Sequence, residues 1–303
     1  MTWQPAREIE LVAGTPAGGG QDRPARALMR VIATMGLVPS GLRLTNIPGR
    51  GGGNGWDYLA QHPGDPHRIA ISSPTLITNR LLGVATLDDG DLTPLATLYN
   101  EYIAFVVRAD SPLREGDGLL RALARPATLT IALATARGNT NHIALARCVR
   151  AAGGEPCALP LHVFDSAPDA VADVLAGHAD VGAITAISAA REIASGALRA
   201  LAVSAPARLP GALGCVPTWR EQGVDCVIGT WRGLVGTRGL APEVIAYWNE
   251  RLARAVTSPE WQTLLAEHAW LPTLLDSAAT RAFLDRERPL LAGALRELEL
   301  QSA

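Results

Sequence analysis

Two glycine-rich loops, each between an expected strand and an expected helix, constrain the fold of this chain more than any other feature. The first follows a strand expected at 9–12, and the second follows a strand expected at 42–46. Their residues are Pro16, Ala17, Gly18, Gly19, Gly20, Gln21 and Asp22 in the first loop, and Pro48, Gly49, Arg50, Gly51, Gly52, Gly53, Asn54 and Gly55 in the second. Glycine permits positive φ and lets a ligand approach peptide N–H groups without interference from a Cβ atom.

A helix that begins after such a loop presents unpaired N–H groups and the positive end of its dipole. Two such corners close together would bind an anion without a charged side chain, and nucleotide phosphate, free phosphate and carboxylate all fit. The phosphate classes are disfavoured because no Lys-Ser/Thr pair follows the glycines. Gly18-Gly19-Gly20 also lacks the third glycine of the dinucleotide fingerprint. The alternative is that each loop is only a tight turn.

The rest of the chain continues the alternation of strands and helices. Further strands are expected at 69–72, 95–98, 103–107, 128–134, 162–164, 181–184 and 198–203. Helices are expected at 139–152, from about Pro168 with Val171, Val174 and Leu175 facing inward, at 242–256, at 259–267 and from about 278. Leu28, Val31, Ile32 and Met35 form one apolar stripe of the first helix. Such alternation favours parallel sheets covered by helices, in two α/β lobes.

Composition fits a globular chain of one large or two ordinary domains, with 48% apolar and 18% charged residues among 303. The formal net charge of -2 gives no reason to expect nucleic acid as a partner. The six histidines show no metal-binding spacing, so neither a metal nor a cofactor is expected. The cysteines (Cys148, Cys157, Cys215, Cys226) are interpreted as small hydrophobes, with local disulfides as the alternative.

The two loops resemble those of the receptors of tripartite tricarboxylate transporters, the Bug-type solute-binding proteins. Pro16–Asp22 resembles their P-x-G-G-x-x-D loop, and Asn46–Gly55 resembles their N-x-P-G-A-G-G-N-x-G loop with one extra residue and Arg50 in place of alanine. Further similar segments lie, in the same order, at 64–69, 164–181, 196–203, 217–223 and 231–234. The resemblance covers about 290 residues.

The resemblance implies an α/β, two-lobed periplasmic-binding-protein-like fold with a ligand cleft between the lobes. One lobe would comprise 1–103 and 229–303, the other 104–228, with crossings near 101–105 and 227–231. It further implies a monomeric receptor that captures a small carboxylate, a di- or tricarboxylate or an aromatic acid, for the membrane subunits of such a transporter. Because family receptors are exported, we expect a periplasmic protein whose leader is removed; a cytoplasmic relative is the alternative.

Ligands of open α/β sheets bind beyond the carboxyl ends of the strands. In the first lobe this places the site at Pro16, Ala17, Gly18, Gly19, Gly20, Asp22, Gly49, Arg50, Gly51, Gly52, Asn54, Ser73 and Thr75. In the second lobe it adds Thr135, Asn139, Thr140, Asp165, Ser166 and Thr185. The alternative for the Asp, Ser and Thr residues is helix capping, and for Arg50 a solvated loop tip instead of a second-carboxylate anchor.

Replacing Gly19 or Gly52 by Val is expected to fill ligand space and abolish binding while leaving the fold largely intact; if the loops are only turns, Val would mainly lower stability. Catalysis is not expected, because no G-x-S-x-G elbow is present. The alternative is an organic-acid isomerase or lyase on the same fold. It would use Asp22 with His142 or Asp165 as an acid/base pair.

Overall fold

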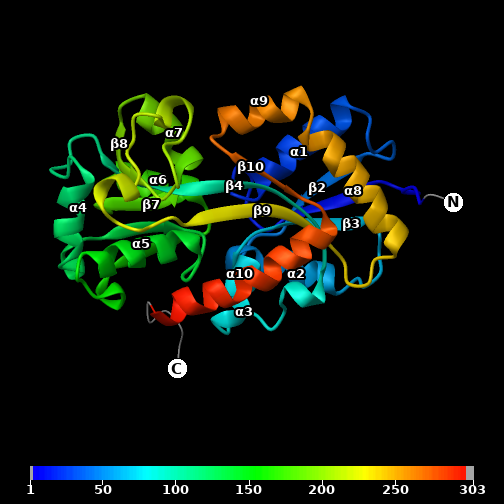
Figure 1. The fold of residues 1–303 in the computed structure, drawn as a ribbon, viewed down its shortest axis with the longest axis horizontal. Coiled ribbons are helices and arrows are strands. Elements are labelled where there is room, and N and C mark those ends of the chain that lie inside the picture. Colours follow the sequence, from blue (N-terminus) through cyan, green and yellow to red (C-terminus); the bar gives the residue numbers. More distant parts are fainter. Residues whose placement is uncertain (1–2, 298–303) are drawn as a thin grey trace. The chain divides into compact units, whose positions relative to one another are not determined.

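Strands alternating with helices form two units in the computed structural model, which describes residues 3–297 (Figure 1). Unit 1 comprises Met1–Asn100 and Trp231–Ala292, and unit 2 comprises Glu101–Thr230 and the chain from Gly293. The chain therefore passes from one unit to the other after Asn100 and returns after Thr230.

The sheet of unit 1 has the strand order β2-β1-β3-β9-β4. These strands are β1 (Ile9–Ala13), β2 (Leu42–Asn46), β3 (Arg68–Ser72), β4 (Thr93–Arg108) and β9 (Gly229–Gly236), and a sixth strand, β10 (Leu271–Leu275), pairs with β4 outside this order. Strand β1 is parallel to both β2 and β3, with Val12 opposite Thr45 and Ala70. Strand β9 is antiparallel to β3, and β10 is antiparallel to the first half of β4. The carboxyl ends of β1, β2 and β3 therefore share one edge.

Helices cover both faces of this sheet, because β1 buries its residues on both sides. Ile9 and Leu11 of β1 are buried in one cluster with α1 (Asp22–Thr34), α8 (Pro242–Val256) and α9 (Pro259–Glu267). Val12 is buried in a second cluster with α2 (Gly53–Ala60) and α3 (Thr75–Leu81). The last helix of the chain, α10, spans Ser277–Glu297. Each buried aliphatic side chain stabilises the fold by about 1.5–3 kcal/mol. Leu28, Val31 and Ile32 of the apolar stripe expected on α1 are buried, while Met35, the C-cap residue just after the helix, is only partly buried against the same core.

Unit 2 repeats the arrangement with three parallel strands, in the order β6-β5-β7. Its strands are β5 (Ile131–Ala134), β6 (Leu161–Phe164), β7 (Val181–Thr185) and β8 (Leu198–Val203), and its helices are α4 (Gly116–Leu123), α5 (Thr140–Ala151), α6 (Ala167–Leu175) and α7 (Ala186–Ala194). The second half of β4 is antiparallel to β7 and β8. Short 3₁₀ turns lie at Arg50–Gly52, Asp89–Asp91, Pro126–Thr128, Pro156–Ala158, Gly211–Leu213 and Arg220–Gln222.

The structure confirms most expected elements and corrects several. The strands expected at 95–98 and 103–107 are one strand, β4, because its residues are buried almost without interruption. The strand expected at 128–134 begins only at Ile131, after a 3₁₀ turn. Strand β10 was not expected. Leu175, expected to face inward, is exposed, whereas Val171 and Val174 are buried.

The cysteines divide into two kinds. Cys148 and Cys226 are buried in the core of unit 2, as small hydrophobes would be, whereas Cys157 and Cys215 are exposed. No disulfide joins them in the described part of the chain, so the local disulfides considered from their spacing are absent. Within residues 3–297, no helix has the length and apolarity needed to cross a bilayer, and no cluster of side chains could hold a metal ion.

Candidate functional site

The three βα corners of unit 1 lie at one edge of its sheet. Because β1, β2 and β3 are parallel, the loops that leave Ala13, Asn46 and Ser72 emerge together. Helices α1, α2 and α3 begin directly after these loops. This edge contains all the site residues expected from the first lobe.

The first loop satisfies much of its own hydrogen bonding. The hydroxyl of Thr15 accepts from the N–H groups of Gln21 and Asp22 at 3.2 and 3.3 Å, so Thr15 closes the start of α1. The Gln21 side chain is buried and accepts from the Gly14 N–H at 2.8 Å. The Gly19 N–H donates to the Pro16 carbonyl at 2.9 Å. Thr15 and Gln21 lie in the loop that sequence reasoning assigned to the site, but they were not among the residues expected to bind the ligand.

Asp22 connects the two glycine loops. One carboxylate oxygen accepts from the Gly18 N–H and from Arg26 Nε, both at 2.8 Å, and the other accepts from Asn46 Nδ2 at 2.9 Å. Burial alone would raise the pKa of this carboxyl group, but the hydrogen bonds from Arg26, Gly18 and Asn46 outweigh burial and lower the pKa below its usual value. The side chain does not cap the first N–H groups of α1, as the capping alternative would require, because Thr15 does so. It orders the loop that precedes the helix.

The second loop is closed by Asn54 and Arg50. Asn54 Nδ2 donates to the Pro48 carbonyl and Asn54 Oδ1 accepts from Arg50 Nε, both at 2.8 Å. The guanidinium of Arg50 is also paired with Asp57, and the Arg50 carbonyl accepts from Asn79. Arg50 is exposed, as the alternative of a solvated loop tip expects, but its guanidinium is paired with protein groups. Gly49, Gly51 and Gly52 all have positive φ, which explains the run of glycines here.

The two glycine loops pack directly against each other. A Cβ atom on Gly14 would lie 2.5 Å from Gly52 Cα, and one on Gly52 would lie 2.3 Å from Gln21 Nε2 and 3.1 Å from Trp56 Cη2. A Cβ atom on Gly19 would lie 2.6 Å from Thr15 Oγ1. The expectation that Val at Gly19 or Gly52 would fill ligand space is therefore wrong, because the new side chain would meet protein atoms. Pro16, Ala17, Gly18 and Gly20 are the more accessible part of this edge.

Three further residues complete the edge. Ser73 follows β3 and is buried, and its hydroxyl has no hydrogen-bond partner among the described residues; Thr75, also buried, begins α3. Arg232 on β9 is buried as well. A Cβ atom on Gly20 would lie 2.9 Å from Arg232 Nη2, so the guanidinium reaches the first loop. Sequence reasoning missed Arg232, since nothing distinguishes it from the chain's other arginines before the strand pairing is known.

In unit 2, the loop after β5 is tightly held. Asn139 is the N-cap of α5, where its side-chain oxygen accepts from the His142 N–H at 3.1 Å and its Nδ2 donates to the Ala134 carbonyl at 2.7 Å. Thr140 shares a hydroxyl–hydroxyl hydrogen bond with Thr230, and Thr135 is half-buried after β5.

His142 is buried near the start of α5. Its Nδ1 accepts from the Gly138 N–H at 2.9 Å. Burial, aided by Arg137, lowers the pKa of His142 to about 4, which keeps the imidazole neutral at pH 7.

The next two corners of unit 2 combine capping with exposed polar groups. Ser166 caps α6 by accepting from the Asp169 N–H at 3.3 Å, which confirms the capping alternative for this residue. Asp165 beside it is exposed. Thr185 precedes α7 and shares a hydrogen bond with Ser188 at 2.8 Å. Because β5, β6 and β7 are parallel, these corners also lie at one edge of their sheet.

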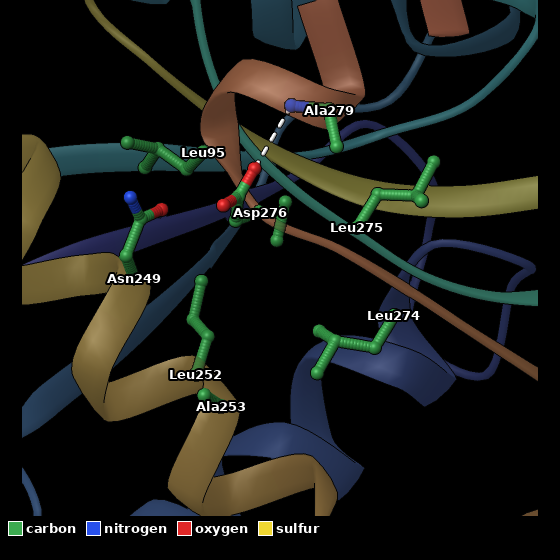
Figure 2. A pocket seen from close by; sticks show the side chains of 9 residues that line it. Leu95, Asn249, Leu252, Ala253, Leu274, Leu275, Asp276 and Ala279 are labelled. Carbon is green, nitrogen blue, oxygen red and sulfur yellow. Dashed lines mark hydrogen bonds between the residues drawn. The ribbon is translucent and has the colours of Figure 1, made fainter.

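A cavity of about 310 Å³ lies elsewhere in unit 1, among β4, α8, β10 and the start of α10. Figure 2 shows its mostly aliphatic lining, with Asn249 and Asp276 as the polar side chains. The Asp276 carboxylate accepts from the Ala279 N–H at 2.8 Å. None of the glycine-loop residues lines this cavity, so it is separate from the candidate site.

Comparison with solved structures identifies the fold. The periplasmic binding protein BugD is similar to this chain with a TM-score of 0.88 and 21% identity, over 99% of this chain and 100% of that one. A Rhodopseudomonas palustris protein with adipate has a TM-score of 0.89 and 21% identity, covering 97% and 98% of the two chains. MatC from the same organism, with bound malate, has a TM-score of 0.84 and 20% identity, covering 96% and 99%. The fold is thus that of the two-lobed periplasmic binding proteins, as expected.

Sequence comparison gives the family. The model of the tripartite tricarboxylate transporter family receptor matches residues 40–290. A UPF0065 protein from the tcbD–tcbE intergenic region of a Pseudomonas species is 30% identical over 263 residues, 84% of this chain and 76% of that protein. BugT of Bordetella pertussis is 27% identical, over 97% of this chain and 90% of that protein. The chain belongs to the tripartite tricarboxylate transporter receptor family, which confirms the resemblance noted from its glycine loops.

Proposed function

We propose that this protein captures a small carboxylate and delivers it to the membrane subunits of a tripartite tricarboxylate-type transporter. The observation that carries the proposal is the pair of interlocked glycine loops at the carboxyl edge of β1–β3, in a member of this receptor family. Helices α1 and α2 start at these loops, so their dipoles favour an anion there. Solved proteins of the same fold with malate and adipate support a carboxylate as the ligand class.

The test is a thermal-shift screen followed by calorimetry. The panel comprises dicarboxylates, tricarboxylates, aromatic carboxylates and amino acids, with neutral sugars and ATP as controls. A ligand at 100 times its Kd should raise the unfolding free energy by about 2.7 kcal/mol. We expect a carboxylate to shift the melting temperature. Stabilisation by sugars or ATP alone would contradict the proposal.

We infer that the protein releases its ligand unchanged. The acid/base pairs considered from the sequence are poorly suited to catalysis, because the Asp22 carboxylate already accepts hydrogen bonds from Gly18, Arg26 and Asn46. The Nδ1 atom of His142 likewise accepts from Gly138. NMR of the best ligand incubated with stoichiometric protein should show no new resonances after many hours. Turnover that is lost in Asp22→Asn or His142→Ala would establish an enzyme instead.

The remaining parts of the proposal concern organisation and place. We propose that the two units are the ligand-gripping lobes, that the protein acts as a monomer, and that it works in the periplasm. Small-angle scattering should then show a smaller radius of gyration when a ligand is added, and light scattering should give the mass of a monomer, 31.8 kDa. Fractionation of the source cells should recover the protein with the periplasmic contents. An unchanged radius with saturating ligand would argue against closure.

A further inference from the structure

Arg232 lies where the first glycine loop meets the sheet. Strand β9 is antiparallel to β3, and their pairing ends with Gly233 opposite Ser72, so Arg232 and Ser73 are the next residues on the two segments just beyond this pair. Its side chain is only 7% exposed. The guanidinium extends to the first loop, where a Cβ atom on Gly20 would lie 2.9 Å from Nη2 and 3.8 Å from Cζ. A buried cation therefore stands at the edge formed by the βα corners of unit 1.

The chemistry of this edge favours a carboxylate acceptor. A guanidinium keeps its charge at all physiological pH values and carries five N–H donors, so it can hold one protein acceptor and still offer a fork to a ligand carboxylate. The acid of the first loop, Asp22, is occupied by Gly18, Arg26 and Asn46. Ser73 directly follows β3 at the same edge, and its buried hydroxyl has no partner among the described residues; a ligand oxygen would supply one.

We propose that Arg232 is the charged anchor for the ligand's carboxylate and that Ser73 provides a second donor to the same ligand. The inference deepens the proposed function and rests on it. Glycine at position 20 follows from the same arrangement, because a methyl group there would meet the guanidinium. Discrimination in favour of an acid over its neutral amide then comes from one side chain, in addition to the backbone N–H groups of the loops.

The test measures both affinity and acid selectivity by calorimetry. The probe is the acid from malate, adipate, succinate, citrate and benzoate that binds the wild-type protein most tightly, paired with its amide. We expect Arg232→Gln to weaken binding of the acid by roughly 10- to 100-fold. The amide should lose much less, so the acid-over-amide ratio should fall. A residue that merely supports the loop would weaken binding of both compounds equally, and that result would overturn the inference.

Two further variants keep the test independent of folding. Gly20→Ala retains the charge but displaces the guanidinium, and no positive φ opposes alanine there; it should also lower the acid-over-amide ratio. Arg238→Gln, which removes an exposed charge from the same unit, should bind like the wild type. Thermal melts identify any variant that fails to fold. If Arg232→Gln fails to fold, the acid-over-amide ratio of Gly20→Ala decides whether the inference holds. If the wild type binds no acid, the proposed function fails; if it binds and both site variants retain the ratio, only this inference fails.

Discussion

The interlocking of the glycine loops predicts a stability defect at Gly52 that can be separated from ligand binding. Gly52 has φ +108, and a Cβ atom there would lie 2.3 Å from Gln21 Nε2 and 3.1 Å from Trp56 Cη2. Positive φ costs an L-residue about 1–2 kcal/mol. Forcing a methyl group against buried neighbours costs typically ~1–3 kcal/mol more. Gly52→Ala should therefore lower the unfolding free energy by roughly 2–5 kcal/mol in total.

A matched control separates the free-energy cost of the steric contact at Gly52 from the cost of its backbone conformation. Gly64 has φ +77, but no atom lies within 4 Å of the position its Cβ would take. Gly64→Ala should therefore cost only the backbone part, about 1–2 kcal/mol. Urea unfolding followed by tryptophan fluorescence gives both values at 25 °C. Equal midpoints for Gly52→Ala and Gly64→Ala would refute the packing argument and return Gly52 to the role of a ligand-facing glycine.

Three other predictions follow from buried or paired groups. Asp22→Asn should lower the unfolding free energy by about 1–3 kcal/mol at pH 7; because the pKa of Asp22 is lowered by folding, this difference should shrink in urea titrations as the pH falls below about 4. His142 has a pKa of about 4 when folded against about 6.5 when unfolded, so up to ~3 kcal/mol of stability should be lost as the pH falls from 6.5 to 4, and His142→Gln should flatten that slope. Mass spectrometry after maleimide treatment should find Cys157 and Cys215 modified in the native protein, and Cys148 and Cys226 only after unfolding; rapid native labelling of Cys148 would show that the core of unit 2 opens.

The sequence located the loops because their signals are local. Glycine runs, the residues before each helix and the apolar stripe of α1 can all be recognised without knowing which strands pair. The family resemblance, read from the same loops, supplied the fold class. Strands 42–46 and 198–203 and helices 242–256 and 259–267 have the expected limits.

The rest depended on contacts between distant segments. Strand β10 contains Pro272 and has alternating exposure, and it is a strand because it pairs with β4. The use of the Gly18 N–H by Asp22, and the approach of the Arg232 guanidinium to Gly20, follow from tertiary packing and strand pairing. The periodicity and composition of the sequence give no information about either of these contacts. Sequence reasoning expected a side chain added at Gly19 or Gly52 to enter ligand space, but it would meet protein atoms at both positions.

The contact between Gly14 and Gly52 has a consequence for changing what such a receptor binds. The Gln21 side chain accepts a hydrogen bond from Gly14 and lies against Gly52. The conformation of each loop therefore depends on the conformation of the other. If one loop alone were replaced by the loop of a relative, it would lack the complementary surface of the second loop against which it normally packs. The two loops should therefore be exchanged as one cassette, together with Gln21 and Trp56, and natural variation in one should be accompanied by compensating variation in the other.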